Sequence, residues 1–495
     1  MDNLLEYLVL NAQKHPDKKA FAFRDKSYSF SGALELARRL AGRIPAALSG
    51  APVAVLVDRS SDAAILFLAV LCSGNYYIPI DPDMPREKIQ AILDDASPRV
   101  ILGDKKHREL LSGLLTEAGF FTLDDAAAEP RPLPTTGGSA PAYMVYTSGS
   151  TGKPKGVLKS HGAVISFIEA YCDTFDFGAE DIIGNQTPFF FDASAKDIYL
   201  ALKTGASLEI IPTELFSMPP MLIEYLNEKK ISFISWVPSA LAIVSQLRTF
   251  SYVLPETLKR VFFVGEVMPM KHLNVWRRAL PEVEFVNLYG QSEIAGICCY
   301  YPVEGEYGDS AVLPMGRALK NCRIYLEDKD GVIHEPGRIG EMYICSEALA
   351  TEYFNDPEKT AACFTCRSFD SLPPARCFKT GDLAQYDEKG NLVFAARTDY
   401  QIKHMGHRIE LGEIEAVAGS LPEIERCCCL YDSVKSKLVL FCQLSQDADI
   451  KAAGIRSLLR PKLSAYMLPG AVKIMDRLPL NANGKIDRQT LKSLL

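Results

Sequence analysis

The sequence predicts an α/β protein with a large N-terminal domain of mostly parallel sheets and flanking helices, followed by a small α+β C-terminal domain. Strand-like and helix-like segments alternate over residues 53–288, which is typical of right-handed crossovers in a parallel sheet. Shorter strands punctuated by Gly and Pro follow over about 310–397 and indicate a β-rich subdomain. A fresh α+β pattern then begins. We therefore expect an N-terminal domain over 1–397 and a C-terminal domain over 398–495.

The elements before the middle of the chain follow from hydrophobic period and from turn residues. Residues 2–13 predict an amphipathic helix that ends before Pro16, and 27–41 predict a short strand and a second helix. The run 124–140, rich in Ala, Pro, Thr and Gly, is typical of a linker. The remaining predicted elements are strands at 53–57, 76–80 and 99–103 and helices at 61–72 and 86–95.

Beyond residue 190 the alternation resumes. Two predicted strands end in polar turns that contain glycine, at 264–266 and 288–293, and ligands of parallel sheets lie just beyond such ends. The predicted helices are 192–203, 218–229, 238–247, 269–279, 411–419 and 450–460. The predicted strands are 207–211, 231–236, 260–264, 284–288, 425–430, 437–443 and 471–475.

Composition excludes several classes of protein. The chain has 495 residues, a net charge of -7 and a pI near 5.7, which argue against a general nucleic-acid binder. No apolar run has the length of a membrane span, and the acidic start lacks the basic region of a signal peptide, so we expect no membrane association. Thirteen scattered cysteines, with a single CxxC at Cys363 and Cys366, favour reduced thiols in the cytoplasm over a zinc site.

The stretch 146–157, YTSGSTGKPKGV, follows an apolar strand and combines glycines, hydroxyls and lysines. Such a loop suits a phosphate chain, because glycines allow close approach and amides, hydroxyls and ammonium groups bind oxygen. It is not a Walker-type P-loop, since only two residues separate Gly149 from Gly152 and Pro154 follows Lys153. Taken alone, the stretch is equally compatible with a surface linker.

The same stretch resembles the phosphate-binding loop of the adenylate-forming superfamily, which includes acyl-CoA synthetases, luciferases and nonribosomal-peptide adenylation domains. Its wording is most similar to the amino-acid-activating branch. The resemblance covers nearly the whole chain, because further stretches match that superfamily's motifs in order. They are 74–82, 191–194 (FDAS), 289–293 (YGQSE), 380–382 (TGD), 397–415, 463–469 (LSAYMLP) and 483–488 (NGKIDR).

The resemblance implies ATP and Mg²⁺ as cofactors. Attack of a carboxylate on the α-phosphate needs fixed cations and a metal to offset the repulsion between anions. The implied catalytic residues are Lys485, which binds the carboxylate and phosphates, and Glu293, which also holds Mg²⁺. Gln291 and Ser292 replace the usual Pro and Thr of their motif. The implied ATP-binding residues are Thr147, Ser148, Gly149, Ser150, Thr151, Gly152, Lys153, Lys155, Tyr289, Ser292, Asp382 and Arg397.

An amino-acid pocket must neutralise an α-ammonium group, and Asp192 stands where the superfamily makes that contact. Lys196 has two interpretations. It pairs with an acidic substrate side chain, or it pairs with protein, for which Asp197 and Glu266 are available, or points outward. By resemblance, the residues that bind substrate are Asp192, Ala193, Lys196, Ser235, Phe262, Val264, Leu288, Gly296 and Ile297.

The resemblance also implies a second step. A mobile C-terminal domain would turn about a hinge at Asp399 and present Lys403 and Gly406 for transfer of the aminoacyl group to a phosphopantetheine thiol. Nothing in the sequence resembles a carrier domain, so we expect a stand-alone enzyme, similar in layout to D-alanyl carrier protein ligases, with a separate carrier protein. Two alternatives stay open: an acyl- or aryl-CoA ligase of the same superfamily, and a nucleotide-binding subunit without ligase activity.

Overall fold

The structure is a computed structural model, and it describes the chain apart from residues 115–117, 128, 149–153, 371, 447 and 481–485. Its internal contacts divide the chain into two units. The first unit comprises Met1–Pro82, Ala96–Val145 and Gly156–Thr398, and the second comprises Asp83–Asp95, Tyr146–Lys155 and Asp399–Leu495. The expected domain boundary between residues 397 and 398 remains a prediction.

The largest sheet of the first unit has nine strands in the order β15-β14-β13-β12-β11-β9-β10-β1-β2. Its middle strands, from β1 to β13, pair in parallel, and β2, β14 and β15 add antiparallel edges. The alternation of strands and helices thus predicted the sheet correctly. The strands are β1 (Lys19–Phe23), β2 (Lys26–Ser29), β9 (Ile182–Asn185), β10 (Ser207–Ile210), β11 (Phe233–Trp236), β12 (Arg260–Val264), β13 (Glu284–Tyr289), β14 (Cys299–Pro302) and β15 (Arg317–Ala318).

A seven-stranded sheet, in the order β19-β8-β7-β4-β3-β5-β6, contains the strands on either side of the glycine-rich loop. Its middle is also parallel, while β19 pairs with β8 antiparallel. The strands are β3 (Pro52–Leu56), β4 (Tyr76–Ile80), β5 (Val100–Leu102), β6 (Gly119–Phe121), β7 (Pro141–Thr147), β8 (Lys155–Ser160) and β19 (Glu352–Tyr353).

The predicted β-rich subdomain is present as a six-stranded sheet with antiparallel pairs. Two cysteines that face each other on β18 and β21, Cys345 and Cys377, form a disulfide, so the expectation that all thiols are reduced is wrong for this pair. The other eleven cysteines are free. The strands are β16 (Cys322–Asp328), β17 (Gly331–Ile333), β18 (Gly340–Ser346), β20 (Phe364–Arg367), β21 (Ala375–Tyr386) and β22 (Leu392–Arg397).

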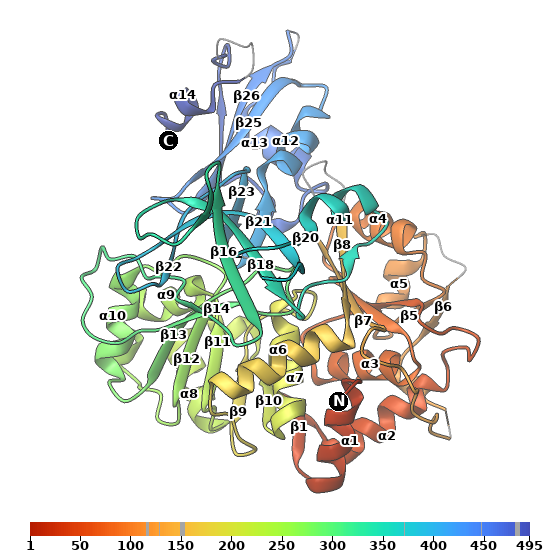
Figure 1. Cartoon of the computed structure of the whole chain (residues 1–495). Coiled ribbons are helices and arrows are strands. Elements are labelled where there is room, and N and C mark those ends of the chain that lie inside the picture. The colour runs from red at the N-terminus through yellow and green to blue at the C-terminus, as the bar shows by residue number, and fades with distance from the viewer. Residues whose placement is uncertain (115–117, 128, 149–153, 371, 447, 481–485) are drawn as a thin grey trace. The chain divides into compact units, whose positions relative to one another are not determined.

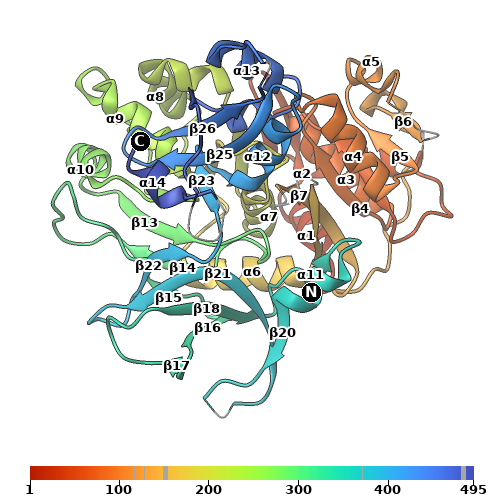
Figure 2. The same cartoon turned by 90° about the horizontal axis from the view of Figure 1, so that it is seen from above.

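Two cores lie on opposite faces of the nine-stranded sheet. Phe233 and Phe262 pack into a core shared with α6, α7 and the seven-stranded sheet, whereas Ile234, Val261 and Phe263 pack under α8, α9 and α10. Side chains alternate across a strand, so neighbouring residues serve different cores. Figures 1 and 2 show α6 and α7 between the strands of the two sheets. The helices are α1 (Leu5–Lys14), α2 (Phe30–Ala41), α3 (Ser61–Cys72), α4 (Arg86–Ala96), α5 (His107–Leu111), α6 (His161–Thr174), α7 (Ala193–Thr204), α8 (Pro219–Glu228), α9 (Pro238–Gln246), α10 (Met270–Ala279) and α11 (Pro357–Cys363).

The second unit has the expected α+β character. A hairpin precedes a three-stranded sheet in the order β25-β26-β27, and α12 and α13 pack on that sheet through a separate core. The elements are β23 (Gln401–His404), β24 (His407–Glu410), α12 (Leu411–Gly419), β25 (Ile424–Asp432), β26 (Lys437–Leu444), α13 (Ala452–Leu459), β27 (Ala471–Ile474) and α14 (Arg488–Lys492). In the part of the chain that the structure describes, no helix combines the length and apolarity needed to cross a membrane.

The elements that the sequence analysis missed include β1, β8, β9 and α6. The strand β1 pairs with β2, the next strand along the chain, and also with β10, which lies far away along the chain. The helix α6 begins at His161. Ser160 caps this helix, because its side-chain oxygen accepts a hydrogen bond from the Ala163 amide. His161 is buried, and its Nδ1 accepts a hydrogen bond of 3.2 Å from the Leu4 amide, so it ties α1 to α6.

Burial predicts a pH dependence for His161, because it lowers the pKa of the imidazole from 6.5 to about 4. Between these values the unfolded chain binds a proton that the folded chain rejects, so the free energy of unfolding falls as pH drops from 6.5 to 4. His161→Asn keeps an acceptor for the Leu4 amide. We expect its free energy of unfolding to fall by about 3 kcal/mol less than that of the wild type between pH 6.5 and pH 4. Urea unfolding at both pH values measures the difference, and equal losses would contradict this role.

Candidate active site

The predicted phosphate loop connects two strands. Thr147 ends β7 and Lys155 begins β8, so the loop leads into a strand, unlike the strand–loop–helix of a Walker P-loop. Ser148 Oγ donates a hydrogen bond of 2.9 Å to the carbonyl of Arg408. Lys155 is buried. The predicted residues Gly149, Ser150, Thr151, Gly152 and Lys153 lie outside the described residues.

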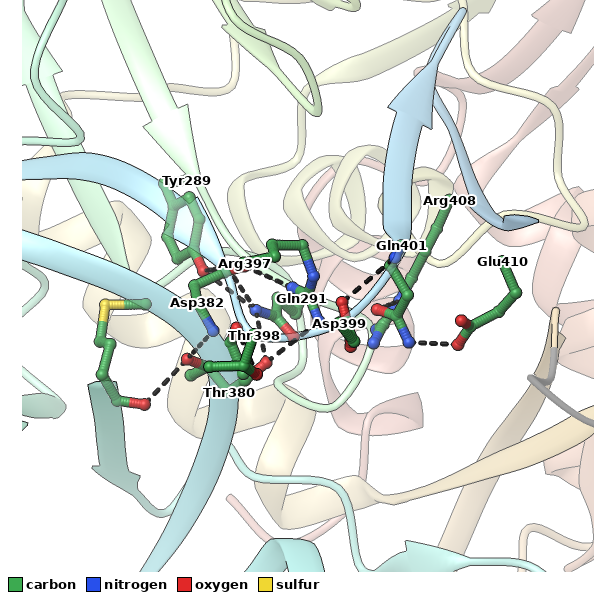
Figure 3. Close-up of polar contacts among 12 residues, drawn as sticks. Tyr289, Gln291, Thr380, Asp382, Arg397, Thr398, Asp399, Gln401, Arg408 and Glu410 are labelled. Carbon is green, nitrogen blue, oxygen red and sulfur yellow. Dashed lines mark hydrogen bonds and ion pairs between the residues drawn. The ribbon is translucent and has the colours of Figure 1, made fainter. Parts of the chain in front are cut away.

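Four residues come together near the end of β13 and the middle of β21 (Figure 3): Tyr289, Gln291, Asp382 and Arg397. Asp382 is buried, and one of its oxygens, Oδ1, accepts a hydrogen bond from Arg397, its register partner on β22. The other oxygen, Oδ2, accepts hydrogen bonds from the Tyr289 hydroxyl and, at 2.7 Å, from Gln291 Nε2. Burial, and secondarily the Asp382 charge, raise the pKa of Tyr289 well above its usual value. These contacts fix both oxygens of the carboxylate predicted to bind ribose.

The turn after β13 is held by side-chain contacts. Gln291, which stands where the superfamily has proline, also donates to the Tyr289 hydroxyl at 3.0 Å. Gly290 has no room for a side chain, since a Cβ there would lie 2.3 Å from the carbonyl oxygen of Gly296. Gly296 itself has φ +95 and packs against Phe167. The lost proline is therefore compensated by hydrogen bonds and close backbone packing.

Glu293 is fully buried, and its Oε1 accepts a hydrogen bond of 2.8 Å from the Tyr353 hydroxyl. Ser292, beside it, is half-buried. A protein bound to Mg²⁺ and a nucleotide commonly supplies one or two carboxylates while phosphates and water complete the coordination. A single fixed carboxylate such as Glu293 fits that donor set.

Asp192 lies at the start of α7 and is already paired with protein. Lys159, on β8, donates a hydrogen bond to Asp192 Oδ1, and the Tyr143 hydroxyl on β7 donates to the same oxygen at 2.9 Å. Lys159 is 0% exposed and its Nζ lies 5.2 Å from the centre of the Tyr143 ring. Burial lowers the pKa of Lys159 and raises that of Asp192, and each charge opposes the shift of the other. The sequence analysis missed Lys159, although a lysine in the apolar run of β8 is a visible signal.

The other predicted substrate residues come from adjacent elements. Ser235, Phe262, Val264 and Leu288 lie on β11, β12 and β13, where Phe262 is in register with Ser235 and Val264 with Leu288. Ala193 begins α7, and Gly296 and Ile297 follow the turn after β13. Ser235 Oγ is buried and makes no hydrogen bond to any described residue. Phe262 is fully buried in a cluster with Tyr171, Phe175, Phe177 and Phe233.

Lys196 pairs with protein, as the second of its two interpretations has it. It is buried, and its Nζ donates a hydrogen bond to the neighbouring Asp197. Asn185 Nδ2 donates 2.9 Å to the other oxygen of Asp197. Glu266, the alternative partner, instead accepts a hydrogen bond of 3.1 Å from the Ser239 amide. The pair supplies its own charge balance, so no acidic substrate group is required.

We therefore expect Lys196→Met to lower the free energy of unfolding by about 3–5 kcal/mol, because Asp197 is left buried without its cation. The double variant Lys196→Met/Asp197→Asn should recover most of this loss. Urea unfolding of the set provides the cycle, and a panel of acids checks selectivity. A shift in selectivity without loss of stability would place Lys196 in the substrate pocket instead.

The second unit contains the predicted hinge and transfer residues. Asp399 begins the last segment of this unit and accepts a hydrogen bond from the Gln401 amide. Lys403 lies on β23 opposite Arg408, and Gly406 has φ +79 in the hairpin turn, a conformation that favours glycine. Gln401 joins Glu410 and Arg408 by side-chain hydrogen bonds (Figure 3). Lys485 lies outside the described residues.

Two family profiles match the chain. Residues 8–354 match the family described as AMP-binding enzyme, and residues 413–485 match the AMP-binding enzyme C-terminal domain. Tyrocidine synthase 3 of Brevibacillus parabrevis is 32% identical over 491 residues, which are 97% of this chain and 7% of that protein. Zwittermicin A synthase ZmaJ of Bacillus cereus is 31% identical over 493 residues, 97% of this chain and 92% of that protein. The chain thus spans a small part of the first relative and most of the second.

Solved structures give the same picture. Holo-PA1221, described as an NRPS protein containing adenylation and PCP domains, superposes with a TM-score of 0.85 at 25% identity, covering 100% of this chain and 84% of that chain. IdnL1 has a TM-score of 0.81 at 27% identity, with 97% and 99% covered. The adenylation domain AlmE of Vibrio cholerae, solved with glycyl-adenosine-5'-phosphate, has a TM-score of 0.85 at 22% identity, with 99% and 98% covered, a likeness of fold.

Proposed function

This chain belongs to the AMP-binding enzyme family and is an AMP-forming ligase of the adenylation-domain type, and from that premise we propose its reaction. The enzyme uses ATP and Mg²⁺ to convert an amino acid, or a close analogue, into its acyl adenylate with release of pyrophosphate. It then transfers the acyl group to the phosphopantetheine thiol of a separate carrier protein.

One observation carries the proposal: Asp192, proposed for the substrate, and Glu293, proposed for the metal, are both largely buried, and each accepts a hydrogen bond from a tyrosine hydroxyl of the protein. The pKa of Asp192 is raised first by burial and also by the negative charge of Glu293. Glu293 follows β13 and Asp192 precedes α7, so the fold unites them from distant parts of the sequence.

The described residues divide the work of the first step. Asp382, held by Arg397, Tyr289 and Gln291, offers oxygens to the ribose hydroxyls, which replace one or more of these donors. Mg²⁺ at Glu293 would neutralise phosphate charge, which lowers the barrier for an approaching carboxylate. The substrate carboxylate is ionised near neutral pH, so the reaction needs no general base. His161 therefore has no chemical role.

The proposed carrier follows from the relatives. Holo-PA1221, a structure that contains adenylation and PCP domains, resembles this chain at 25% identity, and the fused adenylation–PCP protein NpsA-ThdA of Klebsiella oxytoca shares the fold at 20% identity. Holo-PA1221 and IdnL1 are more similar to this chain in sequence than o-succinylbenzoate CoA synthetase is. That enzyme shares only the fold, at 21% identity and a TM-score of 0.86. Pyrophosphate exchange with a panel of amino acids and their analogues tests the first step. Offering coenzyme A or a holo carrier protein as acceptor then separates the carrier ligase from the CoA ligase.

We predict that mutations separate the two half-reactions. Lys485→Ala should abolish pyrophosphate exchange, because the ammonium that stabilises the phosphates is lost, yet still transfer a supplied acyl adenylate to the carrier. Gly406→Leu should do the reverse, since a bulky side chain in this turn would obstruct the pantetheine arm while leaving adenylation intact. Exchange and loading assays on each variant measure both steps. Equal loss of both activities in each variant would contradict the proposal that Lys485 serves the first step and Gly406 the second.

A further inference from the structure

The ion pair between Lys159 and Asp192 occupies the position where a substrate ammonium is expected. Both protein donors, Lys159 Nζ and the Tyr143 hydroxyl, bind the same oxygen, Asp192 Oδ1. Within the described residues, no donor binds the second oxygen, Oδ2, and the Asp192 side chain keeps 10% exposure. Oδ2 is therefore the oxygen that remains for a substrate group while Lys159 stays in place.

The lysine cannot easily leave. Its side chain is 0% exposed and lies beside the Tyr143 ring, which stacks in turn with Tyr77. The Glu293 carboxylate adds a second attraction for its charge. Moving a buried ammonium away from its carboxylate would leave two uncompensated charges, which is unfavourable in an environment of low polarity. Lys159 thus stays beside Asp192 and brings an ammonium group into the site.

A second cation at Asp192 is disfavoured by this arrangement. An α-ammonium on Oδ2 would share one carboxylate with Lys159, and the two ammonium groups would stand roughly 5 Å apart. Repulsion at that separation is worth a factor of about a hundred in affinity at ordinary protein screening. An α-hydroxyl donates to Oδ2 without adding charge. The pair therefore favours a neutral donor on the substrate's α-carbon.

We propose that Lys159 is a specificity-determining residue that makes Asp192 select a hydrogen-bond donor rather than a positive charge, so that the enzyme activates an α-hydroxy acid at least as well as the α-amino acid with the same side chain. This inference rests on the proposed adenylation and narrows its substrate class.

The test is pyrophosphate exchange with matched pairs that differ only at the α-carbon, such as alanine and lactate, leucine and 2-hydroxy-4-methylpentanoate, and phenylalanine and phenyllactate, each as both enantiomers. The measured quantity is the ratio of kcat/KM for the hydroxy acid to that for the amino acid. The variants are Lys159→Met, which removes the charge at similar volume, and Lys159→Arg, which keeps it. Lys203→Met is the matched control, because this lysine pairs with Glu169 on α6 and has no contact with Asp192.

In the wild type we expect a ratio of one or more for the pair with the highest activity. In Lys159→Met the ratio should fall at least tenfold, because Asp192 then needs the substrate's charge. Lys159→Arg and Lys203→Met should keep the wild-type ratio. A purely structural Lys159 would lower both activities together and leave the ratio unchanged, which would overturn the proposal, as would a wild-type preference for the amino acid.

Folding is checked by the Tm of each variant. If Lys159→Met does not fold, the double variant Lys159→Met/Asp192→Asn replaces both charges with neutral groups of similar shape. It should retain the hydroxy-acid activity within about tenfold, and loss of that activity with retained folding would overturn the inference. If the wild type exchanges pyrophosphate with amino acids only, Lys159 does not select for the α-hydroxyl group, and the proposed function stands. A folded wild type that exchanges with no acid would overturn both.

Discussion

Burial of charge is the constraint on which this site depends. Four carboxylates in the interior of the first unit each have a cation or hydroxyl donor supplied by the protein: Lys159 for Asp192, Lys196 for Asp197, Arg397 for Asp382 and Tyr353 for Glu293. A buried carboxylate without a partner would take up a proton or destabilise the fold. The pairs therefore allow several carboxylates to lie buried in one unit before any substrate arrives.

Parallel strands determine where these groups lie. The strands β11, β12 and β13 run side by side, so their carboxyl ends meet at one edge and carry Ser235, Val264 and Tyr289 to the same region. Helix α7 packs in the core between the two large sheets and begins with Asp192 at its N-terminal side. Strands β7 and β8 of the other sheet contribute Tyr143 and Lys159. Asp192 therefore gains its partners from a different sheet, and these contacts exist only once the shared core has formed.

A pair that stabilises the empty site also restricts what the site accepts. In the proposed reaction Asp382 would exchange a neutral donor, Tyr289 or Gln291, for a ribose hydroxyl, which costs little. Asp192 would have to accommodate a second cation beside Lys159, which costs much more. The two carboxylates look alike in the sequence as acidic residues near glycine or small residues, and they differ in the charge of the neighbour that the fold assigns to each.

The sequence by itself determined the fold class, the β-rich subdomain and most helices and strands, because hydrophobic period and turn residues are local signals; α3, β4 and β12 begin and end where the pattern predicted. Motif order likewise identified the family, which the two matched segments confirm. The tertiary structure alone decided that β1 joins the nine-stranded sheet, that Gln291 supports Asp382, that Cys345 bonds to Cys377, and that Lys196 pairs with Asp197. It also placed Lys159 on Asp192. These contacts depend on which residues meet across distant segments, and the charge of a partner 33 residues away leaves no trace in local pattern.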